Sequence, residues 1–192
     1  MSPTSAPWEE QVVAIEARLP NAPAAPIVFT GSSSIALWFS LVRDFPDVPV
    51  FNAGFGGSEM SQVADRAPRI IVPLAPRKIV LFAGENDINH GVSPDEVLEH
   101  FKRFLEITAP VPVVVLSVKP SPARMPLRET METLNSLLQS RCAIDPRLEF
   151  ADLWTPMLDE NGQPRRELWM RDEIHLSRAG YKLWAEILRP VL

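Results

Sequence analysis

The sequence predicts an α/β fold, in which helices cover both faces of a parallel β-sheet. The first observation is a regular alternation of short, β-rich apolar runs with longer stretches of helical period. The second is the length of the chain, because 192 residues suit five such strands and fit one domain. A chain of this length can bury roughly 70 % of its unfolded surface in one core. We therefore expect a five-stranded parallel sheet without any need for disulfides.

Each predicted strand is a short run of apolar and β-branched residues. The strands are expected at residues 27–30, 48–52, 78–83, 111–117 and 148–152. Between them, apolar residues recur at helical spacing in three stripes: Trp8, Val12, Ile15 and Leu19; Val97, Phe101 and Phe104; Leu127, Met131, Leu134 and Leu138. Ser93 followed by Pro94 predicts the start of the helix with the second stripe, and Ser177 predicts the start of the last helix.

Composition excludes several classes of protein. The formal net charge of −5 argues against a nucleic-acid partner, and no run approaches the roughly 20 apolar residues of a membrane span. Cys142 is the only cysteine, which excludes an intramolecular disulfide and a zinc site built on cysteines. We expect a soluble, cytoplasmic protein, with residues 1–7 disordered and residues 8–192 forming a single domain.

Polar and glycine-rich segments follow the first three predicted strands. Gly31 and three serines follow the first strand, "NAGFGGSEM" covers the end of the second, and "GENDINHG" follows the third. Ligands bind beyond the carboxyl ends of parallel strands, so these loops should share one edge of the sheet. Glycine loops can offer backbone N–H groups, and the Asn86 amide is another donor. A serine nucleophile needs such donors for the oxyanion that forms during acyl transfer.

A serine nucleophile also needs a base, and His175 has the most suitable surroundings of the three histidines. Asp172 lies three residues earlier in "RDEIHLSRAGY". A tight turn at this spacing places a carboxylate against one imidazole nitrogen and leaves the other free for the serine. His100 is flanked by charged residues on a predicted helix, which indicates a solvated side chain.

Each segment also has a structural interpretation. The serines could cap a helix, and the glycines could permit a tight turn or cradle a phosphate. The glycine spacing lacks the dinucleotide fingerprint, and no Walker lysine follows it. Asn86 and Asp87 could form a turn, while Asp172 and His175 could be a surface ion pair.

Four short motifs together resemble the SGNH hydrolases, also called GDSL esterases and lipases. They are "FTGSSSI", "NAGFGGS", "GEND" and "DEIH", in the family's order, and they span most of the chain. The resemblance implies a flavodoxin-like three-layer α/β/α fold with strand order 2-1-3-4-5, free of metal and cofactor. It makes Ser33 the nucleophile, His175 the base and Asp172 its partner. It places the oxyanion between the N–H groups of Ser33 and Gly57 and the Asn86 side chain.

The nucleophile motif departs from the family's usual Gly-Asp-Ser-Leu. This chain has Gly-Ser-Ser-Ser, so Ser32 and Ser34 are alternatives to Ser33. Some intracellular bacterial members resemble this chain in having Gly-Ser-Ser and a following tryptophan.

The substrate side is less well marked. Trp38, Phe55, Trp154 and Trp169 could line an acyl or aryl pocket or belong to the core. His90 could touch substrate, while Lys119 and Arg124 could bind an acidic or sugar group or cap their loop. We expect a serine hydrolase for a small ester with a short acyl group; a homo-oligomer is compatible with the sequence. The alternatives are a catalytically silent protein that binds a small ligand or carbohydrate on this fold, and a flavin- or nucleotide-binding protein.

Overall fold

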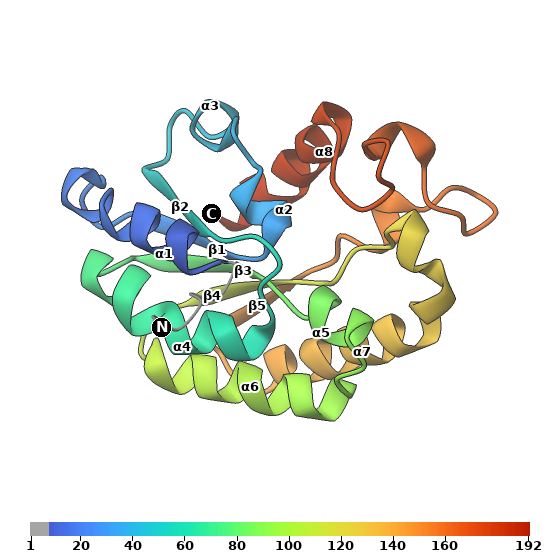
Figure 1. The fold of residues 1–192 in the computed structure, drawn as a ribbon, viewed down its shortest axis with the longest axis horizontal. Helices are drawn as coiled ribbons and strands as arrows, with labels where there is room; N and C mark the ends of the chain where they lie inside the picture. Colours follow the sequence, from blue (N-terminus) through green and yellow to red (C-terminus); the bar gives the residue numbers. More distant parts are fainter. Residues whose placement is uncertain (1–7) are drawn as a thin grey trace, which may run out of the picture.

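The computed structural model describes residues 8–192 and contains a five-stranded, all-parallel sheet (Figure 1). The strands are β1 (Ile27–Gly31), β2 (Val50–Gly54), β3 (Lys78–Phe82), β4 (Val113–Leu116) and β5 (Leu148–Ala151). Their spatial order is β2-β1-β3-β4-β5, which confirms the predicted fold class and strand order. The predicted disordered segment, residues 1–7, lies outside the described residues.

The strand ends differ from the sequence prediction by one or two residues because pairing decides where a strand stops. Val50 of β2 pairs with Ile27, the first residue of β1, so β2 starts after Pro49 and runs on to Gly54. β4 begins at Val113, directly after Pro112, a residue that has no N–H to donate to a neighbour. These shifts leave every strand in its expected place along the chain.

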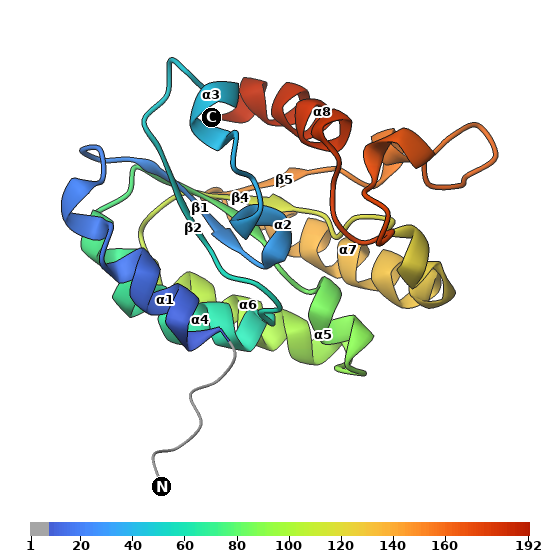
Figure 2. The same ribbon diagram turned by 45° about the horizontal axis from the view of Figure 1, so that its top comes forward.

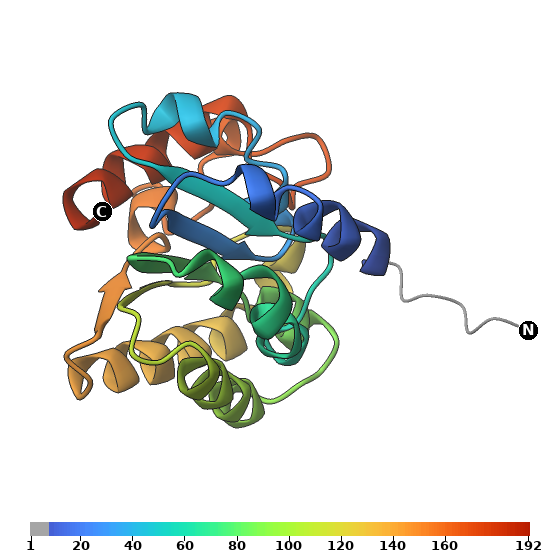
Figure 3. The same ribbon diagram turned by 90° about the vertical axis from the view of Figure 1, so that its left-hand side faces the viewer.

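Helices cover both faces of the sheet, as Figure 2 and Figure 3 show from two further directions. One layer contains α1 (Glu9–Glu16), α4 (Met60–Ile70), α6 (Pro94–Ile107) and α7 (Arg128–Ala143). The other contains α2 (Ser33–Ala36), α3 (Leu41–Asp44) and α8 (Arg178–Leu188). The short helix α5 (Glu85–Asn89) follows β3 at the edge where the parallel strands end. Among residues 8–192, no helix is both long and apolar enough to cross a membrane.

The core consists of two apolar clusters separated by the sheet. Alternate residues of one strand enter different clusters: Val28 faces the layer of α4 and α6, whereas Phe29 faces the layer of α8. Leu81 and Phe82 of β3 divide in the same way. This period of two is expected for a strand that is buried on both faces. The sheet therefore gives its carboxyl-terminal loops a rigid base.

Two predicted helix starts are confirmed. The Ser93 Oγ accepts a hydrogen bond of 3.3 Å from the Glu96 N–H at the start of α6. The Ser177 Oγ accepts one of 3.3 Å from the Gly180 N–H at the start of α8. Each hydroxyl satisfies an N–H that the first helical turn leaves without a partner. The second cap also fixes the chain directly after His175.

Candidate active site

The turn after β1 exposes one of the three consecutive serines. Gly31 has φ +130°, and a Cβ there would lie 1.8 Å from the Phe82 carbonyl oxygen, so only glycine fits. Ser32 and Ser34 are buried, whereas Ser33 is partly exposed at the first position of α2. The Ser32 N–H donates to the same Phe82 carbonyl at 3.1 Å, which ties the turn to β3. Ser33 is thus the accessible hydroxyl at this edge.

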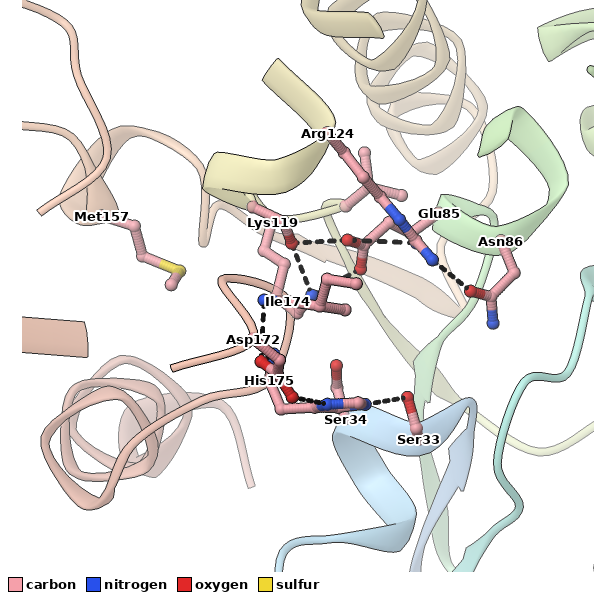
Figure 4. Close-up of polar contacts among 12 residues, drawn as sticks. Ser33, Ser34, Glu85, Asn86, Lys119, Arg124, Met157, Asp172, Ile174 and His175 are labelled. Carbon is pink, nitrogen blue, oxygen red and sulfur yellow. Dashed lines mark hydrogen bonds and ion pairs between the residues drawn. The ribbon is translucent and has the colours of Figure 1, made fainter. Parts of the chain in front are cut away.

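His175 links Ser33 to Asp172 (Figure 4). The His175 Nε2 lies 3.0 Å from the Ser33 Oγ, and its Nδ1 lies 2.6 Å from an Asp172 carboxylate oxygen. Because a carboxylate only accepts, it favours the tautomer with the proton on Nδ1 and leaves Nε2 to accept from the serine. The structure therefore brings together the three side chains that the sequence predicted as a triad.

The Asp172 carboxylate is held by the turn that contains it. Its Oδ1 accepts from the backbone N–H groups of Ile174 at 3.0 Å and His175 at 2.9 Å. Burial alone would raise its pKa, but these bonds and the His175 ring lower the pKa to about 2. Glu173 adopts φ +59°, which closes the turn. Asp172 consequently remains a carboxylate at neutral pH and keeps the imidazole oriented.

The predicted oxyanion donors lie in the loops after β2 and β3. Gly57 has φ +72°, and a Cβ on it would meet open space, so the backbone here is uncovered. Asn86 is the second residue of α5; its Nδ2 donates to the Ser58 carbonyl at 2.9 Å, and its Oδ1 accepts from Arg124 at 2.9 Å. An amide NH2 has two hydrogens. One of them is still available after the bond to Ser58.

Asp87 makes a second contact between the segment that follows β2 and α5. Both of its carboxylate oxygens accept from the Met60 N–H, at 3.0 and 3.1 Å, where α4 begins. Burial raises the pKa of Asp87 to about 6, although the hydrogen bond from Met60 opposes the shift. The segment that carries Gly57 therefore contacts α5 at two points. The Asn86 side chain donates to the Ser58 carbonyl, and the Asp87 carboxylate accepts from the Met60 N–H.

A comparison with known families assigns the chain. A model described as the GDSL-like lipase/acylhydrolase family matches residues 13–183. The chain belongs to this family. It is therefore a carboxylic ester hydrolase, and the resemblance inferred from the four motifs is confirmed at the level of the family.

Individual members agree with this assignment. Platelet-activating factor acetylhydrolase IB subunit alpha1 from Pongo abelii is 29% identical over 167 residues, which cover 81% of this chain and 70% of that protein. A structure from Streptococcus pneumonia, provisionally described as a platelet activating factor, has a TM-score of 0.85 at 20% identity, covering 95% of this chain and 91% of that chain. A mutant of an acetyl-xylooligosaccharide esterase from Geobacillus Stearmophilus has a TM-score of 0.72 at 17% identity, covering 88% and 94%. The two structures show the shared fold.

Lys119 and Arg124, which the sequence suggested as substrate contacts, are instead engaged inside this GDSL-family protein. Lys119 is fully buried, and its Nζ lies 2.6 Å from a Glu85 carboxylate oxygen and 2.7 Å from the Ser121 Oγ. Burial lowers the Lys119 pKa, while the Glu85 carboxylate favours the charged amine. Arg124 lies 3.2 Å from the other Glu85 oxygen and donates to Asn86. Lys119 has no exposed surface with which to bind an acidic or sugar group, whereas for Arg124, 11% exposed, that role stays a prediction.

The suggested aromatic contacts also need correction. Trp38 is buried beneath α2, where its Nε1 donates to Asp44 at 2.8 Å. It lines a cavity of about 530 Å³ between α1, α3 and β2, and none of the triad residues lines that cavity. Phe55 is completely buried and packs against Trp8. Both rings belong to the core, where removing their apolar surface from water stabilises the fold.

His90 lies at the end of α5 and remains half exposed. Its Nδ1 is 2.6 Å from a Glu59 carboxylate oxygen, so the ring is paired with the residue that caps α4. No described contact joins it to Ser33 or His175. Its suggested role in binding substrate stays a prediction.

Sequence reasoning missed Glu85 and Ser121, which complete the buried cluster with Lys119. Glu85 stood inside "GEND" but had no assigned role. The available signal was an isolated lysine three residues after a strand of valine and leucine residues, because a buried lysine requires an anionic partner. The sequence does not say which of the many carboxylates that partner is.

Proposed function

We propose that this hydrolase cleaves small carboxylic esters with short acyl groups through a covalent acyl-enzyme at Ser33. The observation that carries the proposal is the continuous chain of contacts from the Ser33 Oγ through both nitrogens of His175 to Asp172, at 3.0 and 2.6 Å. A hydroxyl becomes nucleophilic when an adjacent base removes its proton, and the base needs a third group to orient it.

In acylation, His175 takes the Ser33 proton as the Oγ attacks the ester carbonyl carbon. The tetrahedral intermediate collapses, the bond to the alcohol oxygen breaks, and His175 returns the proton to that oxygen. Water then attacks the acyl-enzyme carbonyl carbon and gives a proton to His175. The bond from that carbon to the Ser33 Oγ breaks, His175 returns the proton to the Oγ, and the carboxylic acid leaves. In both steps, the negative oxygen accepts from the N–H groups of Ser33 and Gly57 and from the Asn86 amide.

Two findings support a short acyl group. Two connections at the catalytic edge are short, since α2 follows β1 and α5 follows β3 almost directly, which leaves the surroundings of Ser33 and Asn86 compact. In addition, one relative is named an acetylhydrolase and another an acetyl-xylooligosaccharide esterase. We propose acetyl esters of small alcohols or sugars as the first substrates to examine.

The single, buried cysteine fits the proposed cytoplasmic location, which cell fractionation would check.

The test uses 4-nitrophenyl acetate, butyrate and octanoate together with a fluorophosphonate probe. We expect kcat/KM to be highest for acetate, and we expect Ser33→Ala to lose about 10⁴-fold or more in kcat/KM and all labelling. Ser140→Ala, an exposed serine on α7, is the matched control and should retain both. Normal labelling of Ser33→Ala would refute the assignment of the nucleophile, and higher kcat/KM for octanoate would refute the short acyl group.

A further inference from the structure

Arg124 contacts Asn86, the side chain that the proposed function places in the oxyanion hole. We propose that Arg124 is a positioning residue, which fixes and polarises the Asn86 amide so that one of its N–H bonds points at the oxyanion. This inference rests on the proposed function. It gives a role to a buried charged cluster that the triad itself does not use.

The first argument concerns the two ends of the Asn86 amide. An arginine side chain donates hydrogen bonds and accepts none, so the atom that faces the Arg124 Nη2 at 2.9 Å must be the amide oxygen. The NH2 group must then face the opposite way, where one N–H donates to the Ser58 carbonyl at 2.9 Å. With both of these bonds made, the second N–H has one direction left. Figure 4 shows the contact between Arg124 and the Asn86 amide oxygen.

The second argument concerns what holds Arg124. Its Nη1 lies 3.2 Å from a Glu85 carboxylate oxygen, and its side chain is 11% exposed. Glu85 is itself held in place, because Lys119 binds its other oxygen at 2.6 Å and the Ser121 hydroxyl donates at 2.5 Å to the same oxygen that Arg124 contacts. Buried charges of this kind persist when each has its partners. The guanidinium is therefore fixed before any substrate arrives, as a preorganised site requires.

The third argument is electrostatic. The charge that faces the amide is that of the Arg124 guanidinium, whose Nη2 contacts the amide oxygen directly. A charged donor on the amide oxygen withdraws electron density and makes the N–H a stronger donor. An oxyanion exists only in the intermediate and the flanking transition states. Arg124 should therefore act on kcat and leave substrate binding almost unchanged.

The segment that carries Arg124 also contacts the acid–base turn. The Ala123 N–H donates to the Glu173 carbonyl at 3.2 Å, inside the turn between Asp172 and His175. The connection between β4 and α7 thus contacts both halves of the site. Its effect through Asn86 can be separated from any effect on His175 by changing Asn86 itself.

The experiment is a double-mutant cycle with Asn86→Ala, Arg124→Met and the variant that carries both changes, assayed on 4-nitrophenyl acetate. We expect Asn86→Ala to lower kcat about 100- to 1000-fold. Arg124→Met should lower kcat about tenfold in the wild-type background, with KM changed less than twofold. In the Asn86→Ala background, it should have no further effect, because there is no amide left to orient.

Two further variants complete the design. Arg141→Met removes another partly buried arginine, which lies on α7 and pairs with Asp145, and should leave kcat unchanged. Arg124→Lys keeps the charge but loses the second donor, so about a threefold loss of kcat is expected. This variant replaces Arg124→Met in the cycle if thermal melting shows that the latter does not fold.

The possible outcomes separate this inference from the proposed function. If Asn86→Ala and Ser33→Ala both retain full activity, the proposed function is wrong. If those two variants lose activity but Arg124→Met has the same effect with and without Asn86, Arg124 does not act through the amide and the inference is overturned. A rise in KM at constant kcat would overturn it as well.

Discussion

The two sides of the catalytic crevice are built in different ways. On the acid–base side, Asp172 has a side chain 44% exposed, and its partners lie within the next three residues of the chain. On the oxyanion side, the Glu85 side chain is 3% exposed, and its partners come from a loop more than 30 residues further on. One side depends on a local turn near water, and the other on ionic contacts between distant segments in the interior.

Substitutions on the two sides should therefore differ in their effect on the stability of the fold. The local turn can lose a side chain with little effect on stability, because exposed charges contribute about 0 to 1 kcal/mol. The buried cluster cannot, because removing one partner leaves a charge without compensation. Changes on the acid–base side should therefore affect catalysis alone. Changes on the oxyanion side should affect catalysis and folding together.

The largest expected effect is on the exposed side. Asp172→Asn should lower kcat by about 10⁴-fold on an acetate ester, because the amide can stabilise the wrong imidazole tautomer. Since the pKa of Asp172 is about 2, the wild-type residue keeps its charge at any pH above about 4. Steady-state kinetics at pH 7 measure the fall in kcat. Thermal melting at the same pH should show a melting temperature close to that of the wild type. Glu173→Gln removes a neighbouring charge and should keep its activity; a large fall in melting temperature for Asp172→Asn would contradict the comparison.

An intermediate effect is expected at Asp87, on the buried side. Its pKa of about 6 in the folded protein exceeds the ordinary value of 3.8, so folding favours the protonated form. The stability from this protonation is complete below about pH 4 and is lost as the pH rises through 6. Relative to wild type, Asp87→Asn should therefore gain roughly 2 to 3 kcal/mol of unfolding free energy between pH 4 and pH 8. Urea denaturation of both proteins at pH 4 and pH 8 measures their unfolding free energies. The same difference between variant and wild type at both pH values would refute the prediction.

The smallest effect is expected at His90. Its contact with Glu59 is half exposed, so His90→Ala should change the unfolding free energy by less than about 1 kcal/mol. If the ring does not touch substrate, kcat and KM should each change less than twofold, as ester kinetics would show. A KM several-fold higher for His90→Ala, with the melting temperature unchanged, would instead support the original suggestion that His90 contacts substrate.

The sequence predicted the strands, and the edge of the sheet at which the polar loops meet, from local patterns and one geometric rule; the strand order and the choice of Ser33 came from the resemblance to the SGNH hydrolases. Apolar runs gave the strands, and the rule that parallel strands end at one edge brought Ser33 and Asn86 together. The spacing of Asp172 and His175 supplied the third element. Pairing partners lay beyond such reasoning, since a lysine at 119 carries no information on which carboxylate faces it.

The aromatic residues show the same limit. Trp38 and Phe55 follow segments that lead into the site, which made them reasonable candidates for a substrate pocket. Burial is decided by neighbours from other elements, such as Asp44 for Trp38 and Trp8 for Phe55. A single sequence states residue types and spacing, but the direction of a bulky side chain depends on the space left by those neighbours.

The order of the elements along the chain has a consequence for biosynthesis. The proposed nucleophile and oxyanion donors lie directly after the first three strands, and the sheet is complete at Ala151, whereas Asp172 and His175 follow later. A ribosome therefore delivers the serine long before the imidazole that activates it. On the proposed mechanism, the nascent polypeptide should stay inert toward esters until the segment that carries Asp172 and His175 has emerged and docked against the finished sheet.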